Sequence, residues 1–174
     1  VYRRHTNFSI ESIEQTFNGT ADFGKKVSCT ISRNGDLVHR IYLQSKLPDI
    51  SLKRAEGDGQ PVNLGNDTTD LTGGMLRWVN WVGEKMINFA EIEIGGQRID
   101  KHYGEYLEIL SEHTLPEEKR AGFKEMIGRF DSSAKIVEAV EQGTGKVKFY
   151  VPLQFFFCRN PGLALPLIAL QYYE

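Results

Sequence analysis

A clean two-residue alternation in residues 25–33 limits the fold more than any other feature of this sequence. Val27, Cys29 and Ile31 are apolar, while the residues between them are polar. Such alternation is typical of a strand with one buried and one solvated face. A helix would instead repeat its apolar positions every three to four residues. We therefore expect a half-buried strand here.

The turn after this strand does not fit a simple hairpin. Asn34–Gly35 is a strong signal for a two-residue type I′ turn, and a further alternating strand is expected over residues 37–43. Such a turn would pair Ile31 with Val38, which places Ile41 on the opposite face from the apolar residues of the preceding strand. Either the loop is longer or bulged, or the two strands belong to different sheets that face each other.

Five more segments are expected to be strands. They cover residues 6–17, 76–82, 86–94, 146–157 and 165–173. Pro152 cannot donate a ladder hydrogen bond, so it is expected at an edge or a bulge. The last segment is nearly all apolar, which predicts burial on both faces. Residues 46–74 are polar and rich in Gly, Asp, Asn and Thr, and they predict a long loop.

The apolar period changes after the Gly95–Gly96 turn. Residues 102–128 show helical spacing, with Pro116 in the first turn of a second helix and Gly128 at its end. A third helical stretch could cover residues 131–141. Many strands with the helices gathered in one insertion predict an all-β fold, a β-sandwich with a helical insertion.

Composition excludes several kinds of partner. The 174 residues carry a net charge of −2, so no strong field attracts nucleic acid or an anionic membrane, and we expect no direct contact with nucleic acid. Apolar runs fall short of the ~20 residues of a membrane span, so no transmembrane segment is expected. Because the sequence starts at Val1 and stops at Glu174 inside an expected strand, it is interpreted as part of a longer chain.

Cysteines and glycosylation sequons add little. Cys29 and Cys158 are too few for a disulfide framework, and we expect two small hydrophobic side chains in a reducing compartment. Sequons occur at Asn7, Asn18 and Asn66, but the motif is short and common. The sequence does not decide whether any of the three carries a glycan.

Motifs for catalysis are weak throughout. His39 lies on an apolar strand face, where a hydrogen-bonded core histidine is favoured over a metal ligand. Glu91 and Glu93 share a strand face and are interpreted as its solvated or salt-bridged side, although they could form an acid/base pair. Gly143–Lys146 fails the spacing of a phosphate-binding loop. We predict no catalytic residue, no cofactor and no metal, and hence no enzyme.

Four segments in order along the chain resemble the major capsid proteins of the nucleocytoplasmic large DNA viruses. They are Tyr2–Phe17, Ile31–Leu37, Ile92–Tyr103, and Tyr150–Phe157 continuing through Pro161–Tyr172. Each segment alone is a weak signal. Together they cover close to half of the sequence, in the order that the family has, and make a specific match.

The resemblance implies a fold and an assembly. Members of this family carry two eight-stranded jelly rolls in tandem, and three subunits form a capsomer with a pseudo-hexagonal outline. By this mapping residues 1–174 are a partial N-terminal jelly-roll domain with roughly six of its eight strands, a long loop at 46–74 and a helical insertion at 102–128. Consecutive early strands would then lie in opposing sheets, as the register conflict requires.

The implied partners are those of a shell protein. They are two further copies in a homotrimer, neighbouring capsomers and minor capsid proteins, in an icosahedral virion assembled in the host cytoplasm around an internal membrane. Arg3, Arg4, Trp78 and Trp81 are the candidate subunit-interface residues, since Trp often anchors interfaces and Arg can form ion pairs across them.

Two other functions remain open at this stage. A carbohydrate-binding β-sandwich could stack sugar rings on Trp78 and Trp81 beside the polar 46–74 loop. A jelly-roll enzyme of the cupin type is the other alternative, although the absent His-x-His motif argues against it. Fold alone does not choose among these functions.

Overall fold

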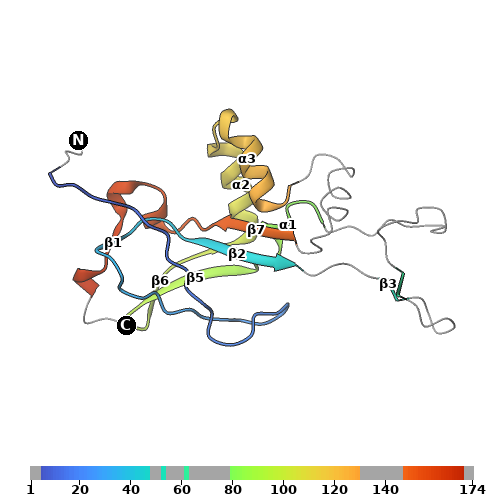
Figure 1. The fold of residues 1–174 in the computed structure, drawn as a ribbon, viewed down its shortest axis with the longest axis horizontal. Helices are drawn as coiled ribbons and strands as arrows, with labels where there is room; N and C mark the ends of the chain where they lie inside the picture. The colour runs from blue at the N-terminus through green and yellow to red at the C-terminus, as the bar shows by residue number, and fades with distance from the viewer. Residues whose placement is uncertain (1–4, 48–51, 54–60, 63–78, 130–146, 171–174) are drawn as a thin grey trace. The chain divides into compact units, whose positions relative to one another are not determined.

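The computed structural model describes residues 5–47, 52–53, 61–62, 79–129 and 147–170 (Figure 1). The chain forms two compact units. The terminal unit contains Val1–Ile41, Glu91–Lys101 and Gln154–Glu174, and the helical unit contains Tyr42–Ala90 and His102–Leu153. Each unit is therefore built from segments that are distant in the sequence.

An antiparallel strand pair forms one side of the core of the helical unit. Strand β2 (Tyr42–Leu47) pairs with β7 (Val147–Pro152) along its whole length, from Tyr42 opposite Pro152 to Leu47 opposite Val147. Side chains alternate across it, and one face buries Leu47, Phe149 and Val151. Pro152 is the last residue of β7, which confirms the expected position at the end of a ladder.

The described residues of this unit form three helices. They are α1 (Val82–Lys85), α2 (Gly104–Thr114) and α3 (Glu117–Ile127). Figure 1 shows α2 and α3 side by side, joined by a short connection. The predicted helical insertion is confirmed, although Pro116 precedes α3 as its N-cap and does not lie in its first turn. Gly128 ends α3 with a φ of 72°, as predicted, because glycine accepts the left-handed backbone of a helix C-cap.

Apolar side chains form a closely packed core in this unit. Val82 of α1, Leu47 of β2 and Phe149 of β7 form a buried cluster, with Met86 packed against it. A methyl group added to Gly83 would lie 2.9 Å from a methyl group of Val151, so glycine is needed for α1 to approach β7.

A hairpin precedes the two long helices. Strands β5 (Phe89–Ile94) and β6 (Gln97–Tyr103) are joined by the Gly95–Gly96 turn, whose glycines have φ values of 60° and 75°. Ile92 is buried and Glu93 is exposed, as the alternation predicts. Strand β6 was not predicted, and it delays the start of the helix from residue 102 to residue 104.

The terminal unit has less regular structure than predicted. Besides most of the β5–β6 hairpin, its described residues form the antiparallel pair β1 (Leu37–Val38) and β8 (Leu165–Pro166). The strands predicted over 6–17 and 25–33 are wrong for this structure: the described residues there form no strand, and one isolated bridge joins Asn18 with Ser28. The simple 31–38 hairpin is absent from the described residues, in agreement with the register argument.

The aromatic run at the end of β7 turns instead of continuing as a strand. Phe156–Cys158 forms a 3-10 helix, η1. The Phe156 N–H donates to Asp100 Oδ2 at 3.0 Å. The strand predicted over 146–157 therefore ends at Pro152, before the aromatic run.

The expected last strand is also shorter than predicted. Two further 3-10 helices, η2 (Pro161–Leu163) and η3 (Ile168–Leu170), flank β8. Leu165 and Leu167 are buried but Ile168 is 65% exposed, so this segment alternates and is not buried on both faces.

The range predicted as a long loop contains short strands where the structure describes it. Strand β2 continues to Leu47, and a short antiparallel pair, β3 (Leu52–Lys53) with β4 (Pro61–Val62), lies within the range predicted as loop. In the segment predicted as a strand at 76–82, the described residues from Val79 onward form a turn into α1. The rest of 46–74, residues 76–78 and the helix predicted at 131–141 lie outside the described residues.

Candidate functional site

The side chains that were candidates for catalysis make structural contacts. His39 is half-buried, and its Nδ1 lies 3.3 Å from the carbonyl oxygen of Phe157, which confirms the predicted hydrogen-bonded histidine. Glu91 forms an ion pair with Lys26. The hydrogen bond from Lys26 lowers the pKa of Glu91, while Glu93 is exposed, so the salt-bridged strand face is confirmed.

The described part of the chain contains neither a cluster of metal ligands nor a helix that could span a membrane. No group of three His, Cys, Asp or Glu side chains within it could hold a metal ion. No helix within it has the length and apolar character needed to cross a bilayer. Both cysteines are free and half-buried, which agrees with the expectation of two unbridged thiols.

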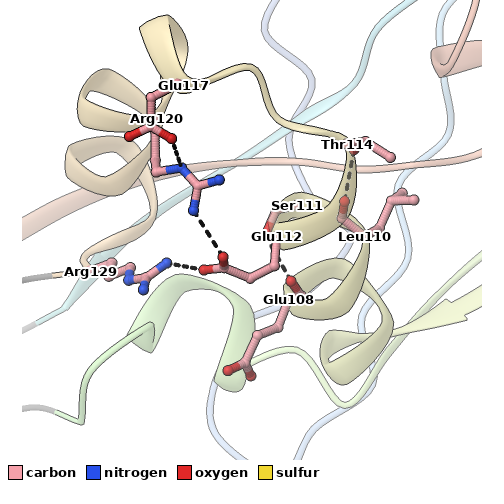
Figure 2. A network of polar contacts seen from close by, with 8 residues as sticks. All are labelled: Glu108, Leu110, Ser111, Glu112, Thr114, Glu117, Arg120 and Arg129. Carbon is pink, nitrogen blue, oxygen red and sulfur yellow. Dashed lines mark hydrogen bonds and ion pairs between the residues drawn. The ribbon is translucent and has the colours of Figure 1, made fainter.

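A polar network joins the helices of the helical unit (Figure 2). Glu112 of α2 accepts a hydrogen bond of 3.0 Å from Arg120 Nη1 and another from Arg129. Arg120 Nε also lies 3.0 Å from Glu117 Oε2. The hydrogen bond from Arg129 lowers the pKa of Glu112. One carboxylate of α2 therefore holds two arginines, one on α3 and one just after it.

Trp81 is the candidate interface residue that the structure describes. It is 9% exposed and has a φ of 63°, and its backbone N–H donates to Asn80 Oδ1 at 3.1 Å. The Arg129 guanidinium carbon lies 3.8 Å from the centre of a Trp81 ring. One face of the indole is thus occupied by the same chain, so a sugar could stack on this face only by displacing Arg129.

The other candidate interface residues are not described. Arg3, Arg4 and Trp78 lie outside the described residues, and their role at a subunit contact stays a prediction. Trp81 also stays a prediction as an interface residue. The structure adds that its ring is fixed against Arg129, which Glu112 in turn binds.

Glu84 is a buried acid that sequence reasoning missed. Its side chain belongs to α1 and is 1% exposed. Burial, followed by the charge of Glu108, raises its pKa to about 7, and Arg129 opposes this rise. Its Oε2 has no hydrogen-bond partner in the described structure. No periodicity marked this residue, since its burial depends on helices that follow much later in the sequence.

An exposed apolar segment is the second feature that the site predictions missed. We call residues 5–33 the N-terminal ribbon. Phe8, Ile10 and Phe23 of the ribbon are 75%, 81% and 64% exposed. The predicted alternation is the signal that could have found this surface, because a half-buried strand requires a covering layer. The sequon residues Asn7 and Asn18 are exposed on the same ribbon, and Asn66 is not described.

Known proteins of one kind match the chain over its whole length. The family model for the N-terminus of the major capsid protein matches residues 1–174. The major capsid protein of Pyramimonas orientalis virus is 49% identical over 100% of this chain and 38% of its own length. For the major capsid protein of Chrysochromulina ericina virus the identity is 45%, over 99% of this chain and 35% of the relative. The chain therefore spans about a third of the length of these relatives.

Solved structures agree with these relatives. PBCV-1 VP54, fitted into a cryo-EM reconstruction of the virophage Sputnik, matches with a TM-score of 0.71 and 39% identity, over 99% of this chain and 34% of that one. A quasi-atomic model of the PBCV-1 virus capsid matches equally well. The predicted fold class, an all-β jelly-roll sandwich with a helical insertion, is confirmed. The chain belongs to the major capsid protein family of the nucleocytoplasmic large DNA viruses, to its N-terminal jelly-roll part.

Proposed function

We propose that this chain is the N-terminal jelly-roll part of a structural subunit of a viral capsid. The observation that carries the proposal is the family match over residues 1–174, together with relatives named as major capsid proteins at up to 49% identity. The capsid structure that the chain resembles supports a place in the virion shell.

The finer proposal concerns assembly. Three copies of the whole protein form a capsomer with a pseudo-hexagonal outline, and many capsomers tile an icosahedral shell. Closed symmetry of this kind needs surfaces that recur on every copy, so many modest contacts add up to a stable shell. Neighbouring capsomers and minor capsid proteins are the proposed partners, with assembly in the host cytoplasm beside an internal membrane.

We also infer that the chain acts through shape and contact and not through catalysis. Its perturbed acids support this inference because each is explained by packing or pairing. Glu91 pairs with Lys26, and Glu112 pairs with Arg120 and Arg129. Such structural pairs perturb pKa values without any reaction.

The mass of the whole protein in solution tests the assembly proposal. Size-exclusion chromatography with light scattering should give three times the subunit mass. A protein that stays monomeric up to the highest soluble concentration would contradict the trimer. An antibody against this chain should also label intact virions in electron micrographs, and virions that never bind it would contradict a place in the shell.

The candidate interface residues are tested separately. Charge reversal of Arg3 and Arg4 to Glu should lower the yield of trimers, because it converts any ion pairs between subunits into repulsion. Lys119→Glu is a matched control on the exposed side of α3. An unchanged trimer yield in the double variant would remove the two arginines from the interface.

A further inference from the structure

The helical unit buries an acid of which one oxygen has no hydrogen-bond partner among the described residues. Glu84 lies on α1, and its Oε2 is buried without a hydrogen-bond partner among the described residues. The start of α2 is close to it, because a methyl group on Gly104 would collide with the Glu84 carbonyl oxygen. A buried carboxyl group in this position is tolerated far better when it is neutral than when it is charged.

The charges around Glu84 come mainly from α2. Glu108 and Glu112 both disfavour its ionised form, and Arg129, which follows α3, favours it. Arg129 is shared, however, because it also binds Glu112 and lies over Trp81. The carboxylates of α2 therefore outweigh the one arginine that acts on Glu84.

The remaining neighbours of α1 offer little compensation. Strand β7 turns buried Phe149 and Val151 toward α1, while its Lys148 is exposed on the other face. From α3, Arg120 reaches Glu112 and Glu117. Among the described residues of this unit, His102, near the end of β6, is the other buried ionisable side chain.

We propose that Glu84, with Glu108 and Glu112 facing it, makes the packing of α1 against α2 and α3 a pH-sensitive joint. The helices are closed while Glu84 holds a proton, and they loosen when it loses that proton. The proposal rests on the helical unit and is independent of the proposed function in a capsid.

The direction and size of the effect follow from proton linkage. Burial raises the pKa of Glu84 from 4.5 to about 7, so the closed state binds this proton more tightly than the open state. Stability from this group is fully present below pH 4.5 and is lost as the pH rises through 7. For one such group the opening equilibrium should increase roughly tenfold between pH 6 and pH 8.5.

Hydrogen exchange of the whole chain measures this opening. Peptides from α2 and α3, corrected for the intrinsic pH dependence of exchange, should open roughly tenfold more at pH 8.5 than at pH 6. Glu84→Gln should abolish the difference, because it keeps the shape and cannot ionise. Glu118→Gln, on the exposed side of α3, is the control and should keep the full response.

A second variant tests the pH-sensitive joint while leaving Glu84 unchanged. Glu108→Gln removes a negative charge that raises the pKa of Glu84, so the opening transition should move to lower pH. Equal opening of the wild-type helices at both pH values would overturn the proposal. A full response in Glu84→Gln, or a shift of Glu108→Gln to higher pH, would also overturn it.

Discussion

Large apolar side chains of the helical unit and of the N-terminal ribbon reach opposite outcomes. In the helical unit Phe149 is 1% exposed and lies between α1, β2 and the end of α3. In the ribbon Phe8 is 75% exposed and its backbone has no strand partner among the described residues. The difference teaches that apolar residues are buried only where the same chain supplies the covering layer.

The largest expected effect contrasts one phenylalanine from each region. Phe149→Ala should destabilise the chain by about 3–5 kcal/mol, since it empties part of a dry core, whereas Phe8→Ala should change stability by less than about 0.5 kcal/mol. Urea denaturation of both variants measures the two values. A loss for Phe8→Ala as large as that for Phe149→Ala would show that the ribbon is packed within this chain.

Two glycines sharpen the contrast inside the helical unit. A methyl group on Gly128 would strike Phe149 and lie 2.8 Å from Val82, at a φ of 72°, so Gly128→Ala should cost about 1–3 kcal/mol. Gly122, within α3, has nothing within 4 Å of the same position. Gly122→Ala should therefore stabilise the helix by about 0.5–1 kcal/mol. Thermal melting of the two variants should shift in opposite directions, and shifts of the same sign would contradict the described packing.

Lowering the pH should destabilise the helical unit through protonation of Glu112. The hydrogen bond from Arg129 lowers the pKa of Glu112 below 4.5. The stability that Glu112 contributes is present above pH 4.5 and is lost as the pH falls through the lowered value. Glu112→Gln should flatten this acid limb of the denaturation profile, and Glu118→Gln should not. If both variants keep the acid limb, the polar network of Figure 2 does not stabilise the helices.

The smallest expected effect is a difference in thiol reactivity. Burial raises the pKa of Cys158 from 9.0, while Cys29 lies on the ribbon. A disulfide reagent at pH 8 should modify Cys29 faster, because the thiolate is the reacting species. Only Cys158 can react in Cys29→Ser, and only Cys29 can react in Cys158→Ser, so the two variants give the two rates separately. Faster reaction of Cys158 would show that the ribbon is the better protected of the two segments.

Local patterns predicted the parts of the fold that local contacts build. The helical period and Gly128 predicted the helical insertion, because the backbone hydrogen bonds of a helix join residues that are close in sequence. Alternation predicted the burial of Ile92 and the exposure of Glu93 in β5. The strands of the ribbon were wrong because alternation shows which face is apolar but does not name the strand that pairs with it.

The site was less predictable than the fold for the same reason. The pairing of β2 with β7 and the burial of Glu84 both depend on segments that are remote in the sequence. The Phe155–Phe157 run has strong strand preference, yet Asp100 and His39 bind its backbone and stabilise a turn. Composition alone could not have shown these contacts.

The pairing of β1 with β8 has a consequence for how the chain is made. Leu37 lies opposite Pro166, so during translation at ~5–20 residues per second β1 waits on the order of ten seconds for its partner to be synthesised. Helices α2 and α3 are neighbours in sequence and can form during that interval. The nascent chain should therefore gain its first structure in its middle, while its earliest residues stay without β8 until synthesis is nearly finished.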